Sequence, residues 1–383
     1  MKKVLVVNTS YRIFGGEDSS FIDEILFLKK FFEVEILSFN NVDRIDIFDF
    51  ISFITTVNFK SNHLLKKKIV NFDPDLIYVH NTWFKAGLGI FKILKKSNKS
   101  IVLKLHNFRF DCTNTFFLKK HLKNNLVCFK CGIEKTKFQI FNKYYPESFL
   151  KSIAVNLYGK RFNKILMNYK NLKVVVLTKY QKKYLLDLGI SSKRLHVIEN
   201  PLNLDIKMPK MDQNKNYFVY AGRIEKNKGL IELLETWKSK NRNFELYIIG
   251  SGNFENQIRT LTKSVKNIQV FGQLEHEKVL YYIKNSVGVV TATKMYEGQP
   301  RIFNEAAALG VPVIFPNFGG MPEFFPEDYP LVFEQFNYED FSNKLDLIEN
   351  KIVTKDLSNV IQNFIFEKLN EEKLKEKFFE LLK

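Results

Sequence analysis

Two carboxylates, Glu297 and Glu305, flank the start of a predicted helix within residues 296–323, which read YEGQPRIFNEAAALGVPVIFPNFGGMPE. Pro300 suits the first turn of a helix because the N–H that it lacks would be unpaired there. The Ala-rich run after it ends at Gly310, a typical residue at a helix C-cap. The unpaired N–H groups at a helix start favour an anion, and carboxylates accept hydrogen bonds from hydroxyls. The stretch therefore predicts a site for a ligand with a phosphate at its centre and a hydroxyl-bearing ring on either side, as in a nucleotide sugar.

The order of residues in this stretch resembles the donor site of the retaining glycosyltransferases of family 4. The resemblance rests on Glu297-x7-Glu305, Gly310-x-Pro312 and Gly319-Gly320-x-x-Glu323. It is strong over residues 217–324 and weak over the rest of the chain. It implies an α/β protein of the GT-B fold, in which two Rossmann-like domains face each other across a cleft. The activity that it implies is transfer of a hexose-type sugar, with retention, from a nucleotide diphosphate sugar to a hydroxyl acceptor. Without the resemblance, the stretch is an ordinary loop–helix–strand unit.

Two basic residues follow a strand predicted over residues 217–221. Arg223 lies just beyond the end of this strand, and Lys228 opens the next helix. Two fixed cations at this place can stabilise a departing nucleoside diphosphate without a metal ion. The resemblance assigns both residues to the diphosphate, Glu297 to the hydroxyls of the donor sugar, and Glu305 to the ribose. A solvated surface Arg and Lys are the alternative.

Glycines mark further points of the predicted donor site. The first predicted strand, residues 2–9, is followed by Gly15-Gly16 and a helix start, where the backbone can approach a phosphate closely. Gly250 ends another predicted strand in a Gly-x-Gly, which permits close approach to a flat ring. The remaining glycines assigned to the donor by the resemblance are Gly298, Gly319 and Gly320. The backbone N–H groups of Gly319 and Gly320, with that of Gly16, would complete the site for the diphosphate.

Histidines lie at the ends of two strands predicted in the first half of the chain, residues 75–80 and 100–106. Strands and helices alternate here as in a parallel sheet, whose ligands bind beyond the carboxyl ends of the strands. The segment HNFRFDC, which begins at His106, resembles the family segment beside the donor sugar, so His106 is a predicted catalytic residue. For His80, a structural and a functional interpretation are equally good.

Length and composition indicate two globular domains. The chain has 383 residues, of which 45% are apolar and 26% charged. We expect an N-terminal Rossmann-like domain on the acceptor side over residues 1–200 and a C-terminal one on the donor side over residues 215–360. The polar segment 203–216 is the expected linker. Residues 361–383 are expected to form a C-terminal helix that can return to the first domain.

The positive charge of the chain lies in its first half. Residues 60–173 alone carry 24 Lys and Arg against 5 Asp and Glu. This excess points to an anionic partner, unless it is simply a solvated lysine-rich surface. No module that binds nucleic acid is recognisable. We therefore expect an anionic membrane surface as the partner, with the acceptor lipid-linked or a glycan.

The three cysteines are too few for a disulfide scaffold and indicate a reducing compartment. The run of apolar residues at the N-terminus is too short for a signal peptide, and no run could span a bilayer. We therefore expect a cytoplasmic protein, peripheral on the inner face of the cell membrane. Three ordinary thiols are the preferred interpretation, and the alternatives are a redox pair or a zinc site formed by Cys112, His121, Cys128 and Cys131.

Neither a cofactor nor a metal ion is expected at the donor site, because no Asp-x-Asp stands there. An NAD-dependent enzyme is disfavoured because no G-x-G-x-x-G follows the first strand. The expected role is synthesis of bacterial surface polysaccharide or glycolipid. The alternatives are a nucleotide-sugar epimerase on the same fold and a non-catalytic protein that binds nucleotide sugars or nucleic acid.

Overall fold

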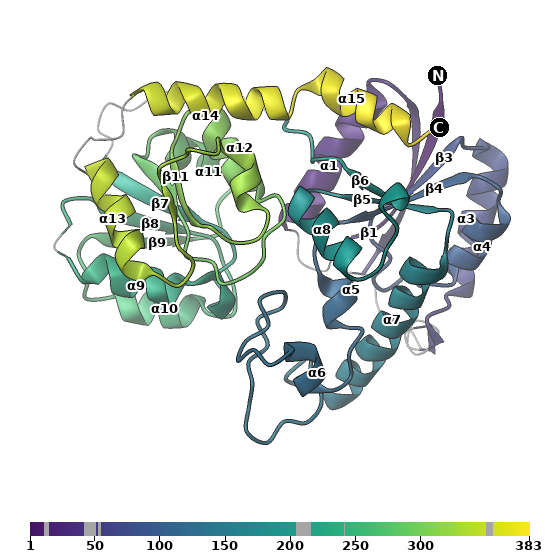
Figure 1. Cartoon of the computed structure of the whole chain (residues 1–383), viewed down its shortest axis with the longest axis horizontal. Helices are drawn as coiled ribbons and strands as arrows, with labels where there is room; N and C mark the ends of the chain where they lie inside the picture. Colours follow the sequence, from purple (N-terminus) through teal and green to yellow (C-terminus); the bar gives the residue numbers. More distant parts are fainter. Residues whose placement is uncertain (11–14, 42–50, 53–54, 204–215, 241, 350–354) are drawn as a thin grey trace. The chain divides into compact units, whose positions relative to one another are not determined.

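The structure, a computed structural model, describes residues 1–10, 15–41, 51–52, 55–203, 216–240, 242–349 and 355–383. These residues form two compact units. Unit 1 comprises Met1–Pro201 with Glu371–Lys383, and unit 2 comprises Leu202–Asn370. Each unit is built around its own parallel sheet (Figure 1). Most of the predicted linker, residues 204–215, lies outside the described residues.

The sheet of unit 1 has six parallel strands in the order β2-β1-β3-β4-β5-β6. Strand β1 is apolar on both faces, and its residues Val4–Val7 are buried, because helices cover both sides of the sheet. Since β1 pairs with β2 on one side and β3 on the other, the topological switch point lies between β1 and β3. The strands are β1 (Lys3–Ser10), β2 (Glu33–Asn40), β3 (Leu76–Val79), β4 (Ser100–Leu105), β5 (Leu172–Val176) and β6 (Leu195–Val197).

The helices of unit 1 begin where the sequence offers capping side chains. The side chains of Asn58, Ser148 and Thr178 each accept a hydrogen bond from the first turn of the helix that follows. The segment between α5 and α7, which contains α6, extends away from the sheet (Figure 1). The helices are α1 (Gly16–Lys29), α3 (Phe59–Phe72), α4 (Ile90–Lys96), α5 (Arg109–Cys112), α6 (Leu118–Leu122), α7 (Phe149–Asn168), α8 (Lys179–Asp187), the short η1 (Ser192–Arg194) and α15 (Glu371–Glu380).

The C-terminal region contains two helices, so the expectation of one helix over residues 361–383 is wrong. Helix α14 (Lys355–Lys368) belongs to unit 2, whereas α15 belongs to unit 1. Asn370 separates the two helices. It directly precedes two glutamates in the first turn of α15, a pattern typical of a helix start. Phe378 of α15 is buried in the core of unit 1, and Lys377 forms an ion pair with Glu199 at 2.6 Å.

The sheet of unit 2 also has six parallel strands, in the order β12-β11-β10-β7-β8-β9. Counted from the first strand of the unit, this is the strand order of a Rossmann fold, and its switch point lies between β7 and β10. The prediction of two Rossmann-like domains is therefore confirmed. The strands are β7 (Tyr217–Ala221), β8 (Glu245–Ile249), β9 (Ile268–Gly272), β10 (Gly288–Val290), β11 (Val313–Pro316) and β12 (Val332–Phe333).

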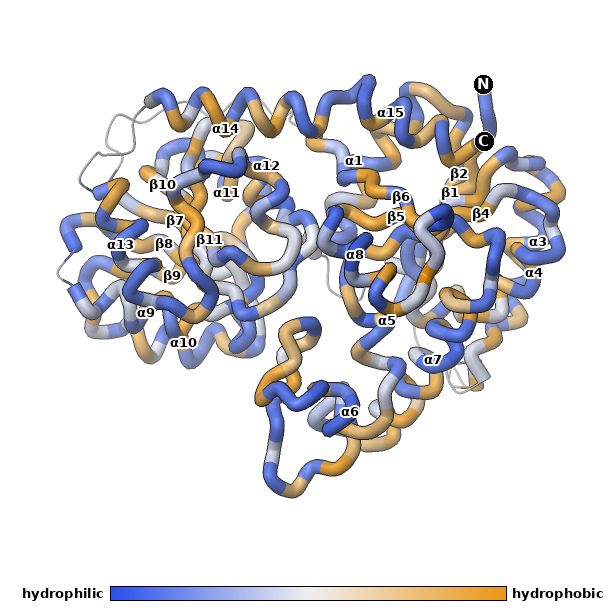
Figure 2. Tube along the Cα trace, viewed as in Figure 1, coloured by the Kyte–Doolittle hydropathy of each residue, from blue (hydrophilic) through white to orange (hydrophobic). Residues whose placement is uncertain are grey.

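The core of unit 2 lies between its sheet and its helices and includes the fully buried Trp237 and Phe218. Figure 2 shows apolar residues concentrated along the strands, while the helices alternate between hydrophilic and hydrophobic positions. In the part of the chain that the structure describes, no helix is both long and apolar enough to cross a membrane. The helices of unit 2 are η2 (Lys226–Lys228), α9 (Leu230–Lys238), α10 (Glu255–Thr262), α11 (His276–Lys284), α12 (Arg301–Ala308), η3 (Met321–Phe324), α13 (Tyr338–Glu349) and α14.

Candidate active site

The predicted donor residues of unit 2 gather at its switch point. Strand β7 pairs directly with β10, so the loops after these two strands leave the sheet side by side. The backbone N–H of Lys294 donates to the carbonyl of Asn227 at 3.0 Å and ties the loops together. The first loop carries Arg223 and Lys228, and the second carries Glu297. Ligands of open parallel sheets bind at this position.

Lys228 and Glu297 form a direct ion pair. Both side chains are mostly shielded from solvent, with 19% and 24% of their surface exposed. The hydroxyl of Thr293 lies 3.3 Å from the same carboxylate oxygen of Glu297. A positive and a negative group are thus held together at the switch point, where the cation can turn to a phosphate and the carboxylate can accept hydroxyl protons.

Arg223 lies at the edge of this site and is 68% exposed. Its guanidinium forms an ion pair with Glu225 at 2.9 Å. Tyr220 of β7 holds the backbone of this loop, because its hydroxyl donates to the carbonyl of Arg223 at 2.8 Å. Burial, and then the charge of Glu297, raise the pKa of Tyr220, so this hydroxyl keeps its proton. The two predicted phosphate-binding cations are therefore held by different carboxylates.

Glu305 lies one turn inside α12 and is almost fully buried. One of its oxygens interacts with His276 at 2.7 Å and with Arg301 at 2.6 Å. The sequence analysis missed His276. The available signal was its place at the start of α11, soon after the end of β9, where site residues of parallel sheets lie.

The glycines of the predicted donor site have different roles in the structure. The N–H of Gly320 donates to the carbonyl of Glu297 at 2.8 Å, so the protein itself uses this donor, and the predicted contact of Gly320 with the diphosphate stays a prediction. Gly319 has a φ of 69°, and a Cβ there would meet the same carbonyl at 2.9 Å. Gly250 has a φ of 140°, and a Cβ there would overlap the carbonyl of Gly222 at 1.9 Å. The protein's own packing therefore accounts for glycine at both places. Gly298 lies partly exposed in the loop before α12.

Gly15 and Gly16 lie in unit 1, at the start of α1. The N–H of Gly15 is bonded to the side chain of Asp18 at 3.0 Å. An added Cβ at either glycine would meet nothing within 4 Å, so packing within the protein does not demand glycine at these two positions. Their predicted approach to a phosphate stays a prediction.

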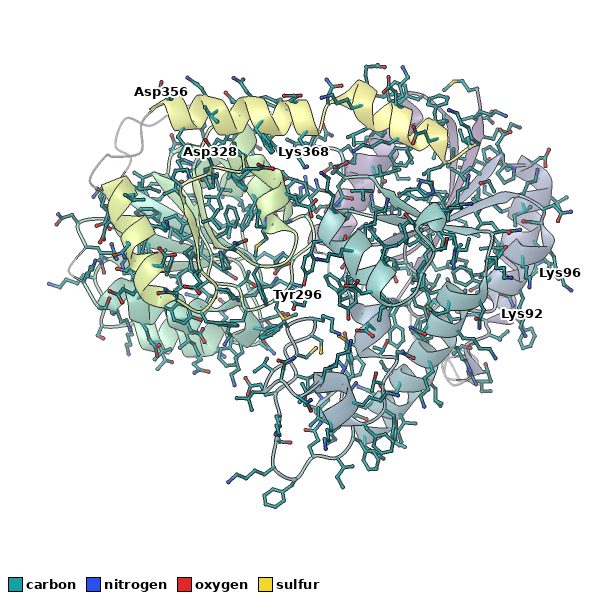
Figure 3. All side chains as sticks on the ribbon, viewed as in Figure 1. Lys92, Lys96, Tyr296, Asp328, Asp356 and Lys368 are labelled. Atoms are coloured by element: carbon teal, nitrogen blue, oxygen red, sulfur yellow. The ribbon has the colours of Figure 1, made fainter. Side chains whose placement is uncertain are left out.

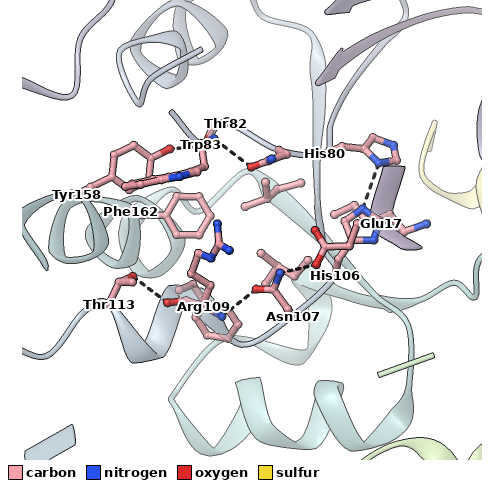
Figure 4. A pocket seen from close by; sticks show the side chains of 15 residues that line it. Glu17, His80, Thr82, Trp83, His106, Asn107, Arg109, Thr113, Tyr158 and Phe162 are labelled. Atoms are coloured by element: carbon pink, nitrogen blue, oxygen red, sulfur yellow. Dashed lines mark hydrogen bonds between the residues drawn. The ribbon is translucent and has the colours of Figure 1, made fainter. Parts of the chain in front are cut away.

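Unit 1 has a cavity at the carboxyl ends of β3 and β4, lined by residues of β4, of the loop after β3, and of α1, α5 and α7 (Figure 4). His80, His106 and Arg109 line it, together with the aromatic rings of Trp83 and Tyr158. The amide of Asn107 donates to Glu17 at 2.6 Å and so links the cavity to the start of α1. Amide, carboxylate and hydroxyl groups between aromatic walls are the usual lining of a small-molecule site. The structure therefore brings His106 and the Gly15-Gly16 turn to one end of the sheet.

His106 contacts a buried polar network beneath this cavity. One of its nitrogens lies 3.2 Å from a nitrogen of His80, so one ring donates to the other. Behind His80, Lys104 forms a fully buried ion pair with Glu24 at 2.7 Å. Burial, followed by the charge of Lys104, lowers the pKa of His106 to about 4. Burial, followed by His106, also lowers the pKa of His80 well below its usual value. Both rings are therefore neutral at pH 7.

The neutral histidines predict that stability falls with acidification. Between about pH 6.5 and pH 4 the unfolded chain takes up protons on these rings while the folded chain does not, so the free energy of unfolding decreases as the pH falls. We expect the Tm to drop from pH 7 to pH 5, and to drop less in His106→Gln. The exposed His63, on α3, gives the control variant His63→Gln. An equal pH dependence in the wild type and His106→Gln would contradict the assignment.

The structure gathers the three cysteines and His121 in the segment between α5 and α7. One ligand atom from each residue lies within 4.8 Å of the others. Cys112, His121 and Cys128 are buried, and Cys131 is partly exposed. No disulfide joins the cysteines.

A comparison with protein families identifies the second half of the chain. Residues 204–364 match glycosyl transferases group 1. The matched range contains the whole switch-point site of unit 2, including Arg223, Lys228, Glu297 and Glu305. The predicted resemblance to this class of glycosyltransferases is thereby confirmed.

Relatives of known name are distant. The chain is 28% identical over 137 residues to a putative teichuronic acid biosynthesis glycosyltransferase, TuaC, of Bacillus subtilis. The matched region covers 36% of this chain and 34% of that protein. The chain is 23% identical over 185 residues to an uncharacterised 41.2 kDa protein in the cps region of Klebsiella pneumoniae, covering 45% of this chain and 50% of that one. The chain thus matches a third to a half of the length of these relatives.

Solved structures resemble the whole chain in fold. A glycosyltransferase from Rickettsia africae has a TM-score of 0.67 at 18% identity, covering 100% of this chain and 99% of its own. HepE of Anabaena, solved with UDP-glucose, has a TM-score of 0.67 at 15% identity and the same coverage. The GT-B fold predicted from the sequence is confirmed by these likenesses.

Proposed function

We propose that the protein is a retaining glycosyltransferase of the hexosyltransferase type, which moves a sugar from a nucleotide diphosphate sugar to a hydroxyl acceptor. The observation that carries the proposal is the Lys228–Glu297 pair at the switch point of unit 2, inside the range that matches glycosyl transferases group 1. HepE of Anabaena, which shares the fold, was solved with UDP-glucose. TuaC is named for teichuronic acid biosynthesis, which favours a role in cell-surface polysaccharide or glycolipid synthesis here.

In this proposal different residues of unit 2 bind different parts of the donor. Lys228, with Arg223, binds the diphosphate and stabilises the charge that develops on it as the sugar departs. Glu297 accepts hydrogen bonds from hydroxyls of the transferred sugar. Glu305 accepts those of the ribose, held in place by Arg301 and His276. No cofactor takes part, and two positioned cations do the work that a metal ion does in other transferases.

His106 is neutral and lines the cavity of unit 1, so it suits a hydrogen bond to a sugar hydroxyl better than an ionic contact with phosphate. The amide of Asn107 and the guanidinium of Arg109 line the same cavity. We assign this cavity to the sugar and hydroxyl end of the reaction.

A product-release assay tests the proposal. The purified chain is incubated with UDP-, GDP- and ADP-sugars, with and without a pool of glycan and lipid-linked acceptors, and free nucleoside diphosphate is measured. We expect one base to be preferred, release to depend on the acceptor, and activity to survive EDTA. Turnover of a nucleotide sugar to its epimer with no acceptor would favour the epimerase instead. Binding of nucleotide sugars without turnover under any condition would favour the non-catalytic alternative.

The acceptor side of the proposal is an anionic membrane surface. The segment between α5 and α7 combines lysines with exposed apolar side chains, because Phe117 is 53% and Phe138 95% exposed. Lys119, Lys120 and Lys123 line a surface hollow with Phe117 and Ile140. Basic residues beside apolar ones suit the boundary of an anionic bilayer, where each lysine contributes about 1 kcal/mol.

Liposome co-sedimentation tests this surface. We expect binding to anionic vesicles, none to neutral ones, and loss of binding as salt screens the charges. Lys119→Glu/Lys120→Glu should reduce binding at least tenfold. The matched control is Lys92→Glu/Lys96→Glu, an equal change of charge at two lysines that extend outward from α4 (Figure 3). Equal loss of vesicle binding in the two double variants would mean that the net positive charge of the chain causes the binding, and that the surface around Lys119 and Lys120 has no special part in it. Equal binding to both vesicle types at low salt would leave the lysines as a solvated surface.

A further inference from the structure

The four side chains gathered between α5 and α7 are spaced like the ligands of one small metal ion. The sulfurs of Cys112 and Cys128 lie 3.9 Å apart, and Nε2 of His121 lies 3.2 Å from the sulfur of Cys131. In a tetrahedral zinc site two sulfur ligands lie about 3.8 Å apart, and a sulfur and a nitrogen about 3.5 Å apart, because the bonds to zinc are about 2.3 and 2.0 Å long. Both measured edges are within a few tenths of an ångström of these values.

We propose that Cys112, His121, Cys128 and Cys131 bind one structural zinc ion. All four positions are taken by protein ligands, which is typical of a structural rather than a catalytic zinc site. The three cysteines bind as thiolates and His121 as neutral imidazole, so each bound ion displaces three thiol protons. The metal site stands whether or not the chain transfers sugars.

The backbone around Cys128 and Cys131 is folded to present both sulfurs to one point. The N–H groups of Cys131 and Gly132 donate to the carbonyl of Cys128, at 3.3 and 2.7 Å, and close a tight turn. Gly132 takes a φ of 74°, a conformation that glycine adopts most readily. The N–H of Cys128 in turn donates to the carbonyl of Ile133 at 2.8 Å. The Cys-x-x-Cys turn is therefore closed by hydrogen bonds of its own backbone.

The other two ligands reach the same point from short helices. Cys112 is the last residue of α5, and His121 lies on α6. Neither helix is longer than five residues, and the strand pairing among the described residues of this segment consists of two isolated bridges. The position of each ligand is therefore set by loops, which need something to hold them.

The buried apolar cluster of this segment is small. It consists of Leu118, Leu122 and two of the cysteines, with Ile133 and Tyr144 packed against it. Segments below about 40 residues rarely hold a fold by apolar burial alone, and usually rely on a disulfide or a metal ion. Since no disulfide is present, a bound ion is the available cross-link. Three sulfurs and one nitrogen as the ligand set favour zinc over magnesium or calcium, which prefer oxygen ligands.

Metal analysis of the full chain tests the proposal. The protein is purified without a metal-affinity step, and zinc and iron are measured by mass spectrometry. We expect about one zinc per chain in the wild type, and less than about one tenth in Cys128→Ser/Cys131→Ser. The exposed His63 on α3 gives the control variant His63→Ala, which should keep its zinc.

A second measurement covers the case in which the double variant does not fold. A mercurial reagent is titrated into the wild-type protein while a dye reports free zinc. We expect one zinc to be released per chain as the three thiols react. Trypsin should then cut at the lysines of the segment faster than in the untreated protein. Wild-type protein that contains no zinc and takes none up, zinc retained by the double variant, or iron in place of zinc would each overturn the proposal.

Discussion

Lys228→Ala should lower kcat/KM by roughly 100- to 1,000-fold, which corresponds to about 3–4 kcal/mol of lost transition-state stabilisation. Lys228 lies at the switch point of unit 2 with most of its side chain shielded from solvent. Its charge is therefore little screened, and the diphosphate gains negative charge as the sugar departs. The affinity for the free nucleoside diphosphate, measured by calorimetry, should fall as well. Lys226→Ala is the matched control, because this exposed lysine lies on the same short helix, η2.

The pairing of Lys228 with Glu297 separates binding from turnover. In Glu297→Gln, Lys228 loses the carboxylate that neutralises it, so the free nucleoside diphosphate should bind as tightly as in the wild type or more tightly. Turnover should nevertheless fall, because the contact with the sugar is lost. Weakened binding of the nucleoside diphosphate in both variants would mean that Glu297 serves only to position Lys228. Near wild-type turnover in Lys228→Ala would remove Lys228 from the mechanism.

The sequence predicted those features that are local along the chain. Strand–turn–helix units show as apolar runs followed by glycine and a capping residue, so both Rossmann-like domains were visible. The start of α12 at Pro300 and the glycine after its end followed from the same local signals. Such features depend on a few neighbouring residues, and the propensities of those residues decide them.

Contacts between residues that are far apart in the chain could not be predicted from the sequence. The ion pair between Lys228 and Glu297, which are 69 positions apart, did not follow from the sequence. Nor did the sequence show that the N–H of Gly320 donates to the carbonyl of Glu297, 23 positions earlier in the chain. Likewise the four side chains of the proposed zinc site are brought together by irregular loops. The path of such a loop cannot be predicted from a periodic pattern of apolar residues.

Lys104→Met should destabilise unit 1 by about 3–5 kcal/mol. Lys104 and Glu24 are both fully buried, and their charged groups lie 2.7 Å apart. Glu24 also accepts a hydrogen bond from the hydroxyl of Tyr78 at 2.9 Å. Methionine fills the space of the lysine stem but leaves the carboxylate buried without its cation, and the desolvation of that carboxylate is then uncompensated. A loss of this size corresponds to a decrease in Tm of about 10 °C for a unit of this length.

A second substitution shows whether the unpaired charge is the cause. Glu24→Gln/Lys104→Met removes both charges and keeps an oxygen that can accept from Tyr78, so we expect it to be more stable than Lys104→Met alone. Lys173→Met on the neighbouring strand β5 is the control, because this lysine is partly exposed and donates to a backbone carbonyl, that of Leu381. It should lower the Tm by far less. If Lys104→Met unfolds at the wild-type temperature, or if the double variant is no more stable than it, the buried pair does not hold the strands beneath the cavity of unit 1.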